Sequence, residues 1–221
     1  MKKNFKNITI IGKSSKFIKI ISSLFYKSYI QEYSWRSIVN LKLTNEMIKK
    51  KPDLIFICGY DYQSHWYSYK KYYYSNITAP FKLVEFLKKK TTLIIYIDTT
   101  NKIKKQIQID KKYTFSRYEF AKKELGYKLF KKYDNLRILN VPLIKDSKNK
   151  VKIFGSNFMS TLFNILLSLN LINSIKISQL KKLIFISIKN KKKIKPIKLK
   201  SFGLSIPRSL FLDRLLRFIH D

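Results

Sequence analysis

The sequence predicts an α/β fold, in which a mainly parallel β-sheet is covered by helices on both faces. Short segments rich in β-branched residues alternate along the chain with segments whose apolar residues recur at helical spacing. Residues 54–58 form an apolar run without polar alternation, as expected where both faces of a parallel strand are buried. These observations indicate a doubly wound sheet.

The chain opens with a strand, a glycine and a helix. Residues 7–11 are mostly β-branched and lead into Gly12, and the apolar residues of 13–25 have helical spacing. In such a turn, backbone N–H groups and a helix N-terminus can face an anion. A phosphate-binding turn is therefore one interpretation, and an ordinary strand-to-helix connection is the other.

The remaining elements are predicted in order along one domain. A second strand ends near Glu32, and a basic helix or loop covers 42–51. The further elements are a strand (52–59), a loop entering a helix (60–74), a helix (76–87), a strand (92–100), a helix (113–132), a strand (136–142), a polar loop (145–152), a helix (158–172), a strand (183–188), a basic run (190–200) and an amphipathic helix (205–219). We expect a core over 1–142 and a small C-terminal extension over 143–221.

The chain is strongly basic, with 47 Lys and Arg against 13 Asp and Glu and a formal net charge of +34. Such a charge is typical of proteins that bind nucleic acid or an anionic surface. Only six of the basic residues are Arg, the residue that nucleic-acid-binding proteins favour for bidentate contacts. The chain is also rich in residues with AT-rich codons, so we interpret much of the lysine excess as the composition of an AT-rich genome. An RNA- or ribosome-associated protein remains an alternative.

The single Cys58 excludes an internal disulfide and suits a reducing compartment. With His65 and His220 it makes no zinc-binding set, so no metal site is predicted. The longest apolar stretch, 158–175, is interrupted by Ser and Asn and predicts a buried amphipathic helix rather than a membrane span. No signal-peptide pattern follows Met1, and we expect a cytoplasmic protein.

The predicted helix over 113–132 carries two pairs of a tyrosine and a cation four residues apart, Tyr118 with Lys122 and Tyr113 with Arg117. Residues at this spacing share one helical face. A neighbouring cation favours the ionised phenol and prepares it for acid–base catalysis. Such pairs also arise by chance in a chain so rich in Tyr and Lys. Because the two tyrosines are five residues apart, about 500° of helix, only one can point at a given site, and we favour Tyr118.

Taken in order, several motifs resemble the short-chain dehydrogenase/reductase superfamily, in its extended group of nucleotide-sugar epimerases and dehydratases. The resemblance covers roughly residues 7–142. It rests on the strand and glycine turn (8–18), the small pair Cys58-Gly59 that ends a strand, Asn76, the hydroxyl-ended strand 96–100, Tyr-x-x-x-Lys (118–122), and the strand 137–142 with its Arg, Asn-Val and proline.

The resemblance implies a Rossmann-like fold with a short C-terminal substrate-side region. It also implies hydride transfer between NAD or NADP and a nucleotide-linked sugar, in the synthesis of a surface polysaccharide. Thr100 would hydrogen-bond the substrate oxygen, Tyr118 would be the acid/base, and Lys122 would lower the pKa of that tyrosine and bind the nicotinamide ribose. The residues expected to contact the cofactor are Gly12, Ser14, Ser15, Phe17, Ile18, Glu32, Arg36, Cys58, Gly59, Tyr60, Asn76 and Lys122. Glu32 stands where a ribose-binding acid is expected, and Arg36 could meet a 2′-phosphate. A homodimer is compatible with the resemblance.

The chain departs from the family pattern at several points. The glycine turn keeps only Gly12, the segment between Thr100 and Tyr118 is short, and Val141 runs directly into Pro142. The substrate-side region is also small. These departures leave a second interpretation open, a degenerate member without catalytic activity that binds nucleotide weakly or serves as a scaffold.

Overall fold

The centre of the molecule is a five-stranded, wholly parallel β-sheet in the order β2-β1-β3-β4-β5. The computed structural model describes residues 5–13, 17–42, 44, 50–98, 117–146, 148, 150, 157–169 and 174–189. The strands are β1 (Asn7–Ile11), β2 (Tyr29–Tyr33), β3 (Leu54–Ile57), β4 (Leu93–Asp98) and β5 (Leu136–Asn140). The prediction of a mainly parallel sheet is confirmed.

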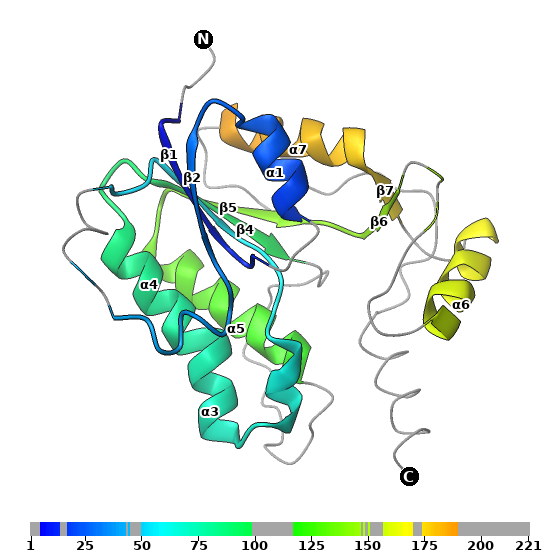
Figure 1. Ribbon diagram of the computed structural model, residues 1–221, viewed down its shortest axis with the longest axis horizontal. Helices are drawn as coiled ribbons and strands as arrows, with labels where there is room; N and C mark the ends of the chain where they lie inside the picture. The colour runs from blue at the N-terminus through cyan, green and yellow to red at the C-terminus, as the bar shows by residue number, and fades with distance from the viewer. Residues whose placement is uncertain are drawn as a thin grey trace.

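Helices cover both faces of this sheet (Figure 1). On one face lie α1 (Phe17–Leu24) and α7 (Ile177–Lys189), and on the other lie α4 (Ala79–Leu87) and α5 (Arg117–Lys132). The other elements are the 3₁₀ helix η1 (Tyr62–Trp66), α3 (Tyr69–Tyr73), the π-helical turn η2 (Tyr74–Thr78), α6 (Asn157–Ser168) and a second parallel pair, β6 (Leu143–Lys145) with β7 (Ser174–Lys176). Among the helices described here, none is long and apolar enough to cross a membrane.

Each face of the sheet has its own hydrophobic core, because successive residues of a strand point to opposite sides. Ile10 of β1 packs in the cluster that includes Ile21 of α1 and Leu183 of α7. Its neighbour Ile11 packs in the cluster that includes Leu83 of α4. The predicted doubly wound architecture is therefore confirmed.

The strand predicted over 183–188 is wrong, because these residues lie in the middle of α7. Leu180, Leu183, Ile184 and Ile188 are buried at helical spacing against the sheet. A short apolar run fits a strand and a buried helix equally well. Residues 60–74, expected to be a loop entering a helix, contain η1 and α3, and the strand predicted over 136–142 ends at Asn140.

The sheet has a topological switch point between β1 and β3, since the chain moves outward from β1 to β2 and then returns to the other side of β1. Gly12 follows β1 at this point with a φ of +120°. A Cβ added to Gly12 would collide with the carbonyl oxygen of Cys58, which follows β3. The close approach of the two strand ends therefore requires glycine at position 12.

Gly12→Ala is expected to destabilise the fold by about 3 kcal/mol, because alanine meets both an unfavourable φ and the Cys58 carbonyl. The free energy of unfolding in urea measures the loss. Lys13→Ala, at the exposed neighbouring position, serves as the control and should stay within about 0.5 kcal/mol of the wild type. Equal stability of both variants would contradict the packing described above.

Candidate functional site

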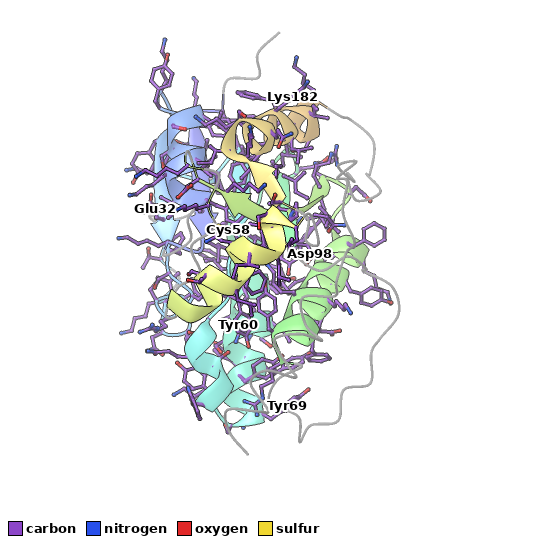
Figure 2. The ribbon with its side chains drawn as sticks, turned by 90° about the vertical axis from the view of Figure 1, so that its right-hand side faces the viewer. Glu32, Cys58, Tyr60, Tyr69, Asp98 and Lys182 are labelled. Atoms are coloured by element: carbon purple, nitrogen blue, oxygen red, sulfur yellow. The ribbon has the colours of Figure 1, made fainter. Side chains whose placement is uncertain are left out.

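The carboxyl edge of the sheet gathers the predicted site residues. Gly12 follows β1, Cys58 and Gly59 follow β3, and Asp98 is the last residue of β4. Gly59 also has a positive φ, of +80°, which lets the chain turn away from the strand. Figure 2 looks from the side of this edge, with Cys58, Asp98 and Tyr60 near the middle of the view.

Lys122 of α5 reaches the ends of β3 and β4. Its ammonium group donates hydrogen bonds to the carbonyl oxygens of Ile97, at 2.7 Å, and Gly59, at 3.2 Å. It lies 4.6 Å from the centroid of the Tyr96 ring, and the Tyr96 hydroxyl donates to the backbone carbonyl of Lys122 at 2.7 Å. These contacts attach α5 to the carboxyl edge.

The Lys122 side chain is only 2% exposed, and burial lowers its pKa to about 8. The negative charge of Asp98, which is also buried, and that of Cys58 in its ionised form oppose this shift. Lys122 therefore changes its charge in a pH range where an exposed lysine stays fully protonated.

Tyr118 lies one helical turn before Lys122 on α5. Its ring makes an edge-to-face contact with Tyr60, with 5.1 Å between the ring centroids. Burial raises the pKa of the Tyr60 and Tyr96 phenols, and Tyr118 adds a smaller contribution in the same direction to both. Tyr118 is thus close to the two phenols that flank the ends of β3 and β4.

Arg117, the cation of the other tyrosine pair, holds the loop after β3. Its Nη1 donates to the carbonyl oxygens of Tyr67, at 2.6 Å, and Ser64, at 3.2 Å. The guanidinium group lies 5.0 Å from the ring centroid of Tyr72, whose hydroxyl donates to the Arg117 carbonyl. Its predicted partner, Tyr113, lies outside the described residues.

Asn76 holds the same loop from the π-helical turn η2. Its Oδ1 accepts a hydrogen bond from the backbone N–H of Asp61 at 3.1 Å, and its Nδ2 donates to the Tyr72 carbonyl at 3.2 Å. The side chain is buried. A π-helical turn is rare and often occurs at functional sites, and here it directs Asn76 toward the residues that follow β3.

The two residues expected near the cofactor ribose occupy different places. Arg36 is 64% exposed, and its Nε lies 3.8 Å from Oδ1 of Asp61, beyond the end of β3. Glu32 belongs to the edge strand β2 and pairs in register with Ile10, so it shares the sheet face that α1 covers. The structure therefore brings Arg36, rather than Glu32, to the end of β3.

The remaining predicted residues lie at the start of α1 or outside the described part of the chain. Phe17 and Ile18 begin α1 and pack against the hydrophobic cluster between the sheet and the helices α1 and α7. The backbone N–H groups of Gly12 and Lys13 both donate to the Tyr33 carbonyl, at 2.8 and 3.0 Å. Three predicted residues, Ser14, Ser15 and Thr100, lie outside the described residues.

Three residues that the sequence analysis missed also lie at this edge. Asp61 is 4% exposed, and its Oδ2 is buried without a hydrogen-bond partner among the described residues. Asp98 is completely buried, and the Trp35 indole donates to the Cys58 carbonyl at 2.9 Å. Their positions just after, or at the end of, predicted strands are a signal that could have identified them.

Comparisons with known proteins show the fold. No family model and no curated protein matches the sequence. The chain is similar in structure to the Bordetella bronchiseptica enzyme WbmG, which has been solved with NAD and also with NAD and UDP. The comparison with the NAD complex has an identity of 8% and a TM-score of 0.62, and it covers 100% of this chain and 80% of that chain.

Two further solved structures are similar. One is a dTDP-4-dehydrorhamnose reductase ortholog from Clostridium acetobutylicum, at 17% identity and TM-score 0.55, covering 84% of this chain and 71% of that chain. The other is the Helicobacter pylori ADP-L-glycero-D-manno-heptose-6-epimerase, at 12% identity and TM-score 0.54, covering 86% and 75%. At these identities the similarity establishes the fold, which this chain shares with solved reductases and epimerases, as the sequence resemblance implies.

The shifted pKa of Lys122 predicts a dependence of stability on pH. The unfolded chain binds the Lys122 proton more tightly than the folded protein does, because the ordinary pKa is 10.5 and the buried one about 8. Stability therefore rises with pH between these two values. From about pH 7.5 to about pH 9.5, the wild type should gain roughly 1–2 kcal/mol in unfolding free energy relative to Lys122→Met.

Urea denaturation at the two pH values measures this gain. Lys123→Met, which changes the next residue on α5, serves as the control and should show the pH dependence of the wild type. If the unfolding free energy of the wild type rises between the two pH values by no more than that of Lys122→Met, the lowered pKa of the buried Lys122 is contradicted.

Proposed function

We propose that the chain is a divergent member of the extended short-chain dehydrogenase/reductase group, and that it transfers hydride between NAD or NADP and a nucleotide-linked sugar at the carboxyl edge of the sheet. The observation that carries this proposal is the position of α5. It holds Tyr118 and Lys122 one turn apart, with the Lys122 ammonium at the ends of β3 and β4.

The residues at this edge fit a dinucleotide. Gly12 leaves no side chain between the turn after β1 and the end of β3, and ligands of such sheets bind at the switch point. Oδ2 of Asp61 and Oδ1 of Asn140, at the end of β5, are buried acceptors without hydrogen-bond partners among the described residues. Acceptors of this kind suit the hydroxyl groups of a ribose or a sugar.

The protein residues then have distinct roles. The cofactor, when bound, accepts or returns the hydride. Tyr118 takes the proton of the sugar hydroxyl, and Thr100 hydrogen-bonds the same oxygen. An ammonium group has three donors, and Lys122 directs two of them to carbonyl oxygens within the described residues. The third is expected to meet the ribose, while the charge favours the ionised form of Tyr118.

One observation favours a second candidate, a protein of this fold that binds nucleotide weakly and does not catalyse. The Tyr33 carbonyl accepts hydrogen bonds from both the Gly12 and Lys13 N–H groups. These two donors are therefore turned away from a pyrophosphate, whose contacts must come from later residues of the turn. Cofactor affinity separates the two candidates.

Titration with NAD(H) and NADP(H), followed by nucleotide fluorescence or calorimetry, is expected to show binding of at least one of them below about 1 mM. Arg36→Gln should weaken the binding of NADP(H) and leave NAD(H) unchanged, because only NADP(H) has a 2′-phosphate for the exposed guanidinium. Failure of all four nucleotides to bind at millimolar concentration would contradict the enzyme proposal.

Tyr118→Phe is expected to reduce turnover of nucleotide-sugar substrates at least about 100-fold, because it removes the acid/base hydroxyl, while cofactor affinity stays within about twofold of the wild type. Tyr127→Phe is the matched control, since Tyr127 lies on the same helix beside Lys131, about half a turn around from Tyr118. If Tyr118→Phe keeps full activity and Tyr113→Phe loses it, the acid/base role belongs to Tyr113.

A further inference from the structure

We propose that the outer face of α7 is a docking surface for an anionic phospholipid membrane. We call this surface the α7 face and define it by Lys182, Phe185, Ile186 and Lys189. The proposal does not depend on the proposed enzymatic function.

Residues 182, 185, 186 and 189 share one side of a helix, since they are three or four positions apart. The opposite side of α7, with Leu180, Leu183 and Ile184, is buried against the sheet. Phe185 is 44% exposed and Ile186 is 39% exposed, although neither is needed for the core. Two adjacent exposed apolar side chains between lysines form a pattern typical of helices that lie at a membrane surface.

The charge around the α7 face is positive and is not neutralised by its own helix or by α1. Neither α1 nor α7, which pack together, contains an acidic residue. The exposed Lys19 of α1 and Lys176 before α7 add to the charge. Glu32, on the same side of the sheet, belongs to the edge strand β2 rather than to either helix.

The other face of the sheet shows that this pattern does not follow from lysine content. On α4 and α5, Glu85 pairs with Lys132, and Glu124 lies 3.8 Å from Lys128. Lysines are frequent on both sides, but on the α4/α5 side carboxylates accompany them. The lysines of α1 and α7 therefore have no carboxylate on either helix to pair with, which leaves them available to an anionic partner.

The side chains of the α7 face suit lipid better than nucleic acid. Its cations are lysines, whose long stems can lie along apolar groups while the ammonium stays in water. It contains no arginine, which nucleic-acid-binding proteins favour for bidentate contacts, and Phe185 is its one aromatic side chain on which a base could stack. After Lys189 the sequence continues to residue 200 with no acidic residue and with Lys191, Lys192, Lys193, Lys195, Lys198 and Lys200.

Docking through the α7 face leaves the carboxyl edge of the sheet accessible. α7 covers a face of the sheet rather than the ends of its strands (Figure 1). In Figure 2, Lys182 lies at the top of the molecule, apart from Cys58, Asp98 and Tyr60. A membrane-bound molecule could therefore still take a ligand at the candidate site.

Co-sedimentation of the full chain with vesicles tests the proposal. We expect binding to phosphatidylcholine vesicles that contain roughly one-third phosphatidylglycerol, weak binding to pure phosphatidylcholine, and loss of binding as the salt rises from about 0.1 M to about 0.5 M. Lys182→Gln with Lys189→Gln should lower the partition coefficient about 25-fold, roughly fivefold for each lysine. Phe185→Ser with Ile186→Ser should lower it at least about tenfold.

Two control variants change the opposite side of the molecule. Lys82→Gln with Lys90→Gln removes two exposed lysines in and after α4, and Phe130→Ser changes an exposed aromatic residue of α5. Both should bind vesicles like the wild type, and circular dichroism checks that every variant is folded.

The proposal is overturned if the wild type does not bind anionic vesicles, or if the control lysine variant loses as much affinity as the α7 variant. It is also overturned if the apolar α7 variant binds vesicles normally while single-stranded RNA binds the wild type more tightly than vesicles do. That result would assign the surface to nucleic acid.

Discussion

The candidate site depends on the burial of one cation, the ammonium group of Lys122. A buried charge is costly unless oxygen atoms replace its hydration, and here the carbonyls of Gly59 and Ile97 do so. Together with the Tyr96 hydroxyl, which donates to the Lys122 carbonyl, these contacts hold α5 against the ends of β3 and β4. The place of Tyr118 follows from this attachment, because it lies one turn earlier on the same rigid helix.

The residues that follow β3 are held by polar side chains from two helices. Asn76, on the π-helical turn, accepts a hydrogen bond from the Asp61 N–H group. Arg117, at the start of α5, donates to the carbonyl oxygens of Ser64 and Tyr67. These contacts satisfy backbone groups that a buried loop would otherwise leave unpaired. The guanidinium of Arg117 thus stabilises the loop, whereas the ammonium of Lys122 reaches the strand ends, and this difference supports the choice of Tyr118 over Tyr113.

Base composition accounts for how many lysines the chain has, but not for where carboxylates accompany them. The ion pairs of the α4/α5 side and the acid-free helices α1 and α7 occur in the same lysine-rich protein. A net charge of +34 is therefore less informative than its distribution, and the distribution becomes visible only when the helices are placed on the two faces of the sheet.

The sequence by itself determined the fold class, the positions of the five strands of the central sheet and the motif on α5, because apolar runs and helical spacing are local properties of the chain. The division at residue 142 and the roles of all the predicted site residues stay predictions, and Ser14, Ser15, Thr100 and Tyr113 also lie outside the described residues. Tertiary structure decided that 183–188 is helical, since packing against the sheet selects between two conformations that an apolar run allows equally. It also decided the contacts of Trp35 with Cys58 and of Lys122 with Ile97, because these partners are 23 and 25 residues apart in sequence and meet only at the carboxyl edge of the folded sheet.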